Sequence, residues 1–192
     1  VLATPKHFLL NNQETRRNQH DSRCSERALR EIYGNAFEQV IKKSDPALLM
    51  ASYNKINGVY SHYHYDLFTT LLRQEWGYRG AVVTDWWIQP GKSPDNEKIY
   101  DNAYRVQAQV DVLMPGVGPR DGDQDRSLLD SYTSKKGITL GELQRNAKNV
   151  LRSVMKSPAF RKKHALPLYQ YTPQGETFIV NKEAESLPLL ET

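Results

Sequence analysis

The stretch Ala81-Val82-Val83-Thr84-Asp85-Trp86-Trp87 runs from a short apolar segment directly into a carboxylate and two tryptophans. A short apolar run that ends abruptly in polar residues is typical of a buried strand of a parallel sheet, whose carboxyl end opens into a loop. The run Ala47–Ala51 ends in the same way, and so does Val110–Met114. The sequence therefore predicts three buried parallel strands whose carboxyl ends share one rim.

Stretches with helical spacing lie between and before these strands, at Ser25–Lys43, Tyr65–Glu75 and Asn96–Gln107. Gly77 and Gly80 end the second of these helices. Lys6–Leu10 can supply a fourth strand. About 30 residues per strand and helix fit a parallel sheet or a (β/α)8 barrel, and four strands supply about half of such a barrel.

The clearest helix follows Thr139, which forms a capping box with Glu142. Its basic residues are expected to be solvated, whereas its apolar residues mark one predicted core face: Leu143, Ala147, Val150, Leu151 and Val154. After Pro158, prolines, a glycine and a basic run break any period, which predicts a linker along the surface.

Composition narrows the class of protein. The 192 residues are 39% apolar and 25% charged, as in a soluble globular domain. No apolar run approaches the roughly 20 residues of a membrane helix, so no membrane partner is expected. A net charge of +4 is too small and too evenly spread to indicate a nucleic-acid partner, and none is expected. The single cysteine, Cys24, excludes an internal disulfide framework. The compartment stays open between secreted or periplasmic and cytoplasmic, and the start at Val1 is interpreted as an internal piece of a longer protein.

Polar residues that follow the predicted strands are the candidate site, because carboxyl ends of parallel strands are where sites form. These residues are Lys6, His7, Tyr53, Asn54, Asp85, Trp86 and Trp87. Asp85 can attack a ring-shaped substrate that stacks on the tryptophans. The alternative is that Asp85 accepts backbone hydrogen bonds or caps the next helix.

His62, His64 and Asp66 are considered as metal ligands, but no further ligands follow at a suitable spacing, and we interpret them as a solvated helix start. No metal and no cofactor are predicted.

Several linked motifs together resemble glycoside hydrolase family 3. Lys6-His7-Phe8 with Asn12, Glu14 and Arg17 comes first, followed by Arg27 to Tyr33 and by Met50-Ala51-Ser52-Tyr53-Asn54. Leu71 to Gly80 and Val82-Val83-Thr84-Asp85-Trp86 complete the series. The resemblance persists to Met114-Pro115 and returns at Ala184-Glu185-Ser186. The run after Phe8 favours the β-glucosidase-like branch over the β-N-acetylglucosaminidase branch.

This resemblance implies a retaining, exo-acting β-glycosidase, most simply a β-glucosidase, that acts on β-glucosides or oligosaccharides. Asp85 matches the nucleophile, Lys6 and His7 match residues that bind sugar hydroxyls, and Trp86 matches an aromatic platform. Met50 and Tyr53 match residues that line the pocket of the nucleophile, and Arg17 matches the motif with a less defined, structural duty. β-Xylosidase or another exo-glycosidase of the family is an alternative, as is a catalytically incomplete carbohydrate-binding fragment.

The resemblance also implies an α/β fold that is the C-terminal half of a (β/α)8 TIM-type barrel over residues 1–157. Residues 158–192 would form a linker and the start of a second, α/β sandwich domain. The acid/base glutamate would come from that second domain. Expected partners are therefore the remainder of the barrel and a C-terminal domain.

Overall fold

A computed structural model of the chain describes residues 2–115, 126–166, 168–171 and 177–180. The helices, which include 3-10 and π-type turns, are α1 (Glu26–Ala28), η1 (Leu29–Tyr33), α2 (Asn35–Ser44), η2 (Ser61–Tyr63), η3 (Asp66–Glu75), α3 (Asp101–Gln107), α4 (Ser127–Thr133), α5 (Leu140–Lys156) and α6 (Pro158–Lys163). The strands are β1 (Asp21–Ser22), β2 (Leu48–Met50), β3 (Lys55–Ile56), β4 (Val59–Tyr60), β5 (Ala81–Val83), β6 (Leu168–Tyr171) and β7 (Thr177–Val180).

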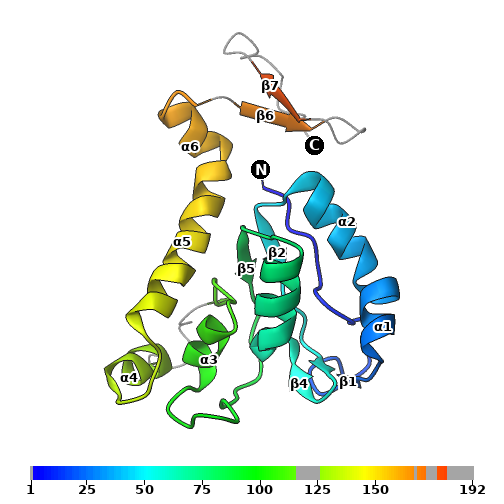
Figure 1. The fold of residues 1–192 in the computed structure, drawn as a ribbon, viewed down its shortest axis with the longest axis vertical. Coiled ribbons are helices and arrows are strands. Elements are labelled where there is room, and N and C mark those ends of the chain that lie inside the picture. Colours follow the sequence, from blue (N-terminus) through cyan, green and yellow to red (C-terminus); the bar gives the residue numbers. More distant parts are fainter. Residues whose placement is uncertain (1, 116–125, 167, 172–176, 181–192) are drawn as a thin grey trace.

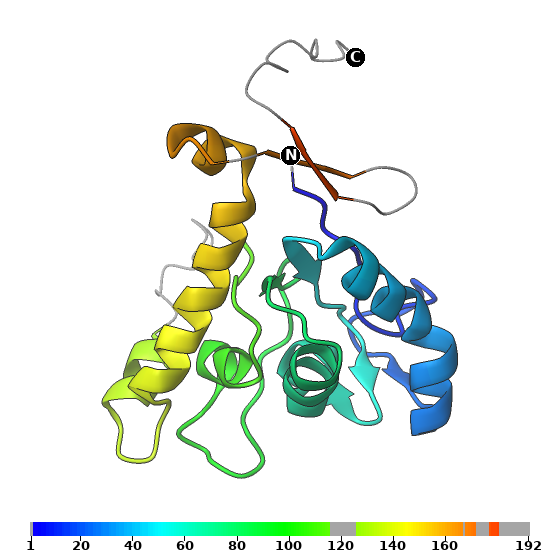
Figure 2. The same ribbon diagram turned by 45° about the horizontal axis from the view of Figure 1, so that its top comes forward.

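The centre of the molecule is the parallel pair β2 and β5, in which Leu49 lies opposite Val82. Parallel bridges extend this pair on both sides, from Phe8 to Ala51 and from Val83 to Val112. The four predicted strand segments are therefore parallel and follow one another in chain order. Figures 1 and 2 show α2 on one side of this sheet and the long helix α5 on the other.

Aromatic side chains form the core beneath the first strand segment. The ring of Phe8 is fully buried and lies 5.1 Å from that of Phe37, 5.6 Å from Phe68 and 5.9 Å from Trp76 between centroids. Tyr78 is also buried in this cluster. The cluster joins the first strand segment to α2 and η3, so burial of apolar area holds the unit together.

The helix expected over Asn96–Gln107 begins later, at Asp101. The residues before it form a loop that is closed by a bridge between Lys92 and Tyr100 and by a bond from the Ser93 N–H to the Ile99 carbonyl. Their backbone groups are used in the loop and are not available to a helix. Gly77, with φ +74°, ends η3 as expected, because a left-handed residue cannot continue the helix.

The predicted core face of α5 is confirmed only in part: Leu143 packs against a buried cluster that includes Val106, and Val150 is half-buried. Asn149 and Ser153 are buried on this helix, whereas Leu151 is 60% and Val154 46% exposed. The capping box of Thr139 and Glu142 is confirmed. The reason is chemical: the side of α5 that meets the sheet faces backbone groups, which polar side chains can bind and apolar ones cannot.

Two basic residues of α5 are also not simply solvated. Arg145 donates to the Val106 and Gln107 carbonyls at 3.2 and 3.1 Å, and Lys156 forms an ion pair with Asp45.

The segment after Pro158 is more regular than a linker. Ser157 caps α6 by accepting from the Phe160 N–H at 3.2 Å, and Pro158 occupies the first turn, where it needs no hydrogen-bond acceptor. β6 and β7 then pair antiparallel. The predicted linker therefore contains regular elements, and the predicted resemblance at Ala184-Glu185-Ser186 lies outside the described residues.

Candidate active site

Asp85 lies two residues after the carboxyl end of β5, and only 8% of the residue is exposed. Its Oδ1 accepts a hydrogen bond from the Trp86 N–H at 2.8 Å. One oxygen thus has the backbone role that the alternative interpretation expected. The second oxygen, Oδ2, does not take part in this backbone hydrogen bond and lies next to a different residue.

That residue is His7, whose Nε2 lies 3.3 Å from Asp85 Oδ2. Partial burial lowers the pKa of His7, and this effect outweighs the opposing attraction of Asp85. At neutral pH the imidazole is therefore largely uncharged beside the carboxylate. Lys6 precedes it and is exposed, and its positive charge lowers the pKa of His7 further.

Tyr53 covers another side of this carboxylate. Its hydroxyl donates to the Trp86 carbonyl at 2.7 Å. Burial, and then the neighbouring Asp85, raise the pKa of the Tyr53 hydroxyl, so it stays protonated as a donor. The Arg17 guanidinium lies 4.7 Å from the centre of the Tyr53 ring and also pairs with Glu14 at 2.6 Å. Arg17 therefore contacts Tyr53, and its influence on the candidate site is indirect.

Met50 and Trp86 line an apolar groove of about 480 Å³ between the central strands and α5. Side chains from both central strands and from α5 line it as well, among them Leu48, Val83, Val112, Val150 and Val154. Val83 and Trp86, on either side of Asp85 in the sequence, thus lie against an apolar surface.

Other sequence candidates lie elsewhere. Asn54 is fully buried and donates to the Leu9 carbonyl at 3.2 Å, so it supports the core of the chain. His62 is fully buried, which contradicts the interpretation of a solvated helix start, and His64 accepts from the Leu67 N–H at 3.3 Å. Within the described residues, no three His, Cys, Asp or Glu side chains gather as metal ligands.

Two residues that the sequence analysis missed lie beneath the loop after Asp85. Tyr63 and Arg105 both donate to the Gln89 carbonyl, at 2.9 and 2.8 Å. A signal existed in the sequence, because Arg105 lies between Ala103 and Val106 on a helix face that is otherwise buried and apolar. A single basic residue on such a face is uncommon unless it is paired.

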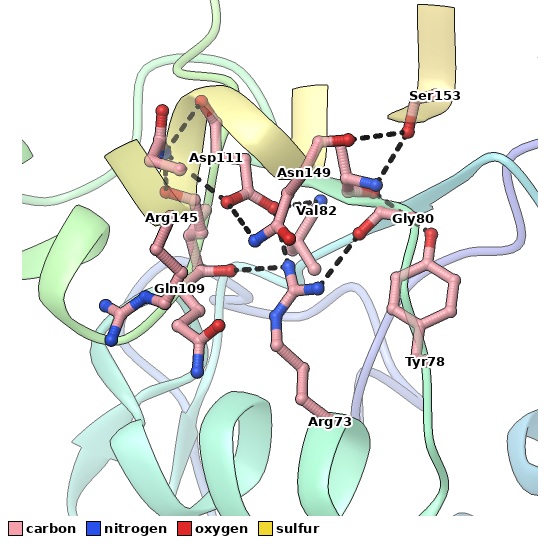
Figure 3. A network of polar contacts seen from close by, with 12 residues as sticks. Arg73, Tyr78, Gly80, Val82, Gln109, Asp111, Arg145, Asn149 and Ser153 are labelled. Carbon is pink, nitrogen blue, oxygen red and sulfur yellow. Dashed lines mark hydrogen bonds and ion pairs between the residues drawn. The ribbon is translucent and has the colours of Figure 1, made fainter. Parts of the chain in front are cut away.

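Figure 3 shows a second buried network, which binds the backbone of Gly80 and Val82. Arg73 and Asp111 form an ion pair at 2.6 Å, with 8% and 0% of their side chains exposed. Asp111 also accepts from the Val82 N–H at 2.9 Å and from Asn149 at 3.0 Å. Burial raises the pKa of Asp111, while the Arg73 guanidinium opposes that rise. This network joins η3 and α5 to the strand that carries Asp85.

Comparisons with known proteins agree with this arrangement. Residues 1–151 match the description "Glycosyl hydrolase family 3 N terminal domain". A β-glucosidase from Ruminococcus albus is 40% identical over 166 residues, which is 85% of this chain and 17% of that protein. An exo-α-(1→6)-L-arabinopyranosidase from Bifidobacterium longum is 56% identical over 86 residues, or 45% of this chain and 11% of that protein.

A solved structure of β-glucosidase 3B from Thermotoga neapolitana in complex with glucose superposes with a TM-score of 0.71 at 34% identity. The match covers 84% of this chain and 22% of that one. The chain thus spans less than a quarter of the length of these relatives. Across the described residues, no helix combines the length and apolar character needed to cross a membrane.

The parallel α/β architecture, with a carboxylate at a strand end and this likeness to solved enzymes, defines a glycoside hydrolase domain. The chain belongs to glycosyl hydrolase family 3. Its fold is accordingly the barrel-like α/β fold of that family, of which the chain is a part.

Proposed function

We propose that the protein containing this chain is a retaining β-glucosidase in which Asp85 is the nucleophile. The observation that carries the proposal is the geometry of Asp85: a nearly buried carboxylate at a strand end, with one oxygen held by the Trp86 N–H and the other beside His7. The glucosidase relatives and the glucose complex support the substrate class.

The two steps follow from this carboxylate. An Asp85 oxygen forms a bond to the anomeric carbon while the bond to the leaving oxygen breaks, and that oxygen takes a proton from a separate acid. Water, deprotonated by the same group, then attacks the anomeric carbon and releases Asp85. Retaining enzymes hold the two carboxyl groups about 5 Å apart. We assign the acid to a glutamate of a domain that follows this chain.

The neighbours of Asp85 have distinct roles in this proposal. An uncharged His7 can donate an N–H to the Asp85 carboxylate or to a sugar hydroxyl, and Lys6 offers a second donor for the sugar. Tyr53 holds the Trp86 carbonyl, which fixes the peptide that joins the aromatic platform Trp86 to Trp87. Met50 and Trp86 provide an apolar wall. Arg17 acts by packing on Tyr53.

We further propose that residues 1–157 are the later half of a (β/α)8 barrel and that residues 158–192 lead to a second domain. The apolar groove supports the half-barrel proposal. A large exposed apolar surface between strands and a helix is typically buried against another part of a protein. The remaining barrel strands are the expected occupant. The chain expressed alone should aggregate or unfold without cooperativity, whereas an isolated, monomeric, cooperative domain would contradict the half-barrel proposal.

Labelling tests the nucleophile. A 2-fluoro β-glucoside should trap a covalent intermediate on the natural polypeptide, and peptide mapping should find the label on Asp85. Asp85→Ala should lose about four orders of magnitude or more in kcat, because the bond-forming group is absent. Asp45→Ala, at an exposed helix end, is the matched control and should keep full activity. A label on any other residue would disprove the assignment.

The glycone is a separate question, because the arabinopyranosidase relative shares the segment with high identity. β-Xylosides and α-L-arabinopyranosides lack the hydroxymethyl group of glucose. Turnover of the 4-nitrophenyl derivatives of all three sugars decides between the candidates. A higher kcat/KM for the xyloside or the arabinopyranoside would replace the β-glucosidase proposal while leaving Asp85 as nucleophile.

A further inference from the structure

The loop that follows Asp85 is anchored at two backbone carbonyls. The Trp86 carbonyl accepts from Tyr53 at 2.7 Å, and the Gln89 carbonyl accepts from both Tyr63 and Arg105, at 2.9 and 2.8 Å. Trp87 and Ile88 lie between these anchors. The loop is thus held at both ends, and the free part between them carries one tryptophan.

The second anchor is built inside the protein. Tyr63 is 2% and Arg105 5% exposed, and Arg105 Nη2 also donates to the Tyr63 hydroxyl at 2.6 Å. The guanidinium lies 4.7 Å from the centre of the Tyr63 ring, and its Nη1 donates to Asn102 at 2.6 Å. Hydrogen bonds in such a dry site are strong, and removal of one donor leaves a buried acceptor poorly satisfied.

Gly91 ends the loop against the same tyrosine. Its N–H donates to the Asp101 side chain at 2.9 Å, and its carbonyl accepts from the Asp101 N–H at 2.7 Å. A Cβ at Gly91 would come within 2.6 Å of the Tyr63 ring, so only glycine fits there. The ring of Tyr63 therefore defines where the loop returns to the core.

The loop holds Trp87 in an unfavourable conformation. Its φ is +51°, in the left-handed region that bulky residues rarely adopt, and 64% of the residue is exposed. A strained backbone persists only where surrounding contacts determine it, and such positions concentrate at functional sites. The core cluster gains little from an indole with this exposure, but the exposed ring offers a stacking face two residues after Asp85.

We propose that Trp87 is a specificity-determining residue for the leaving group and that Tyr63 and Arg105 are its positioning residues. Trp87 stacks on the aglycone, either an aromatic ring or a second sugar ring, and the Tyr63–Arg105 pair keeps it there by fixing Gln89. This inference rests on the proposed glycosidase function. It assigns Trp87 to the glycosylation step only, because the aglycone has left before water attacks.

The test uses the natural polypeptide and two substrates, phenyl and methyl β-glucoside. The measured quantity is the kcat/KM for the phenyl glucoside divided by that for the methyl glucoside. Trp87→Ala should lower this ratio about tenfold, because stacking on the phenyl ring is lost. Tyr63→Phe removes one donor to Gln89 and should lower it about fivefold. Tyr104→Phe, on the ring that stacks on Tyr63 at 4.7 Å, is the matched control and should leave the ratio unchanged.

The rate of release of a trapped 2-fluoroglucosyl enzyme should be the same in all variants. An unchanged substrate ratio in Trp87→Ala would overturn the inference for Trp87. If Tyr63→Phe lowers the melting temperature but leaves the ratio unchanged, the positioning role is overturned.

A second measurement is independent of catalysis. In Tyr63→Phe the amides of residues 86–91 should exchange with solvent about fivefold faster, while those of β5 keep their rates. If the wild-type protein hydrolyses no glycoside, the proposed function fails, and this exchange measurement still decides whether the anchor positions the loop. Unchanged exchange would overturn the anchor.

Discussion

Replacement of Asp111 by Asn should destabilise β5, the strand that leads to Asp85. The substitution removes the negative charge from an ion pair in which neither side chain is more than 8% exposed, so Arg73 stays buried without its counter-charge. Breaking a buried pair from one side costs about 3–5 kcal/mol. A domain has about 5–15 kcal/mol of stability in total, so the change is large.

Hydrogen exchange of the β5 amides in the natural polypeptide measures this cost locally. Because about 1.4 kcal/mol corresponds to a factor of ten, exchange at Val82 should accelerate by about two to four orders of magnitude. Glu75→Gln is the matched control. It removes one charge from the pair with Arg30, whose side chains are 38% and 39% exposed, and it should cost less than about 1 kcal/mol.

A double-mutant cycle isolates the pair itself. Arg73→Met together with Asp111→Asn leaves no buried charge, so the double variant should be about 2–3 kcal/mol more stable than the sum of the single effects predicts. If the single effects add to within about 0.5 kcal/mol, the pair is not coupled and the reasoning is refuted.

Three further predictions concern other parts of the chain. Ser153→Ala should cost about 1–2 kcal/mol, measured by hydrogen exchange of the β5 amides in the natural polypeptide, because Ser153 accepts from the Ala81 N–H at 2.8 Å and donates to the Ala47 carbonyl at 2.6 Å; no loss would show that this bridge contributes nothing. Tyr53→Phe should lower kcat/KM for aryl glucosides about tenfold by freeing the Trp86 carbonyl, whereas Tyr65→Phe, which is exposed, should have no effect. Burial, aided by Arg105, holds the pKa of His62 well below 6.5, so the folded protein rejects a proton that the unfolded chain binds. Protonation of His62 therefore costs no stability above about pH 6.5. Below that pH the free energy of unfolding falls by at most about 1.4 kcal/mol per pH unit for this group, and His62→Gln should flatten the slope in unfolding of the natural polypeptide between pH 7.5 and 5.5.

Several features of the fold follow from short stretches of sequence. The apolar run Ala81–Val83 and its polar continuation predicted a buried strand with Asp85 at its carboxyl end, and the structure confirms this placement. The capping box at Thr139 and the glycine end of η3 were predictable for the same reason. Each depends on backbone sterics or hydrogen bonds between residues close in the chain.

The sequence by itself determined the strand ends, the helix caps and the motifs of the family. Only the tertiary structure decided which side chains meet: that α5 buries Asn149 and Ser153 while Leu151 and Val154 stay exposed, that His62 is buried in the core, and that Arg105 reaches the carbonyl of Gln89. The physical reason is that periodicity records how polar a residue is, but not which buried backbone group needs a partner. That need arises only when segments distant in sequence come together.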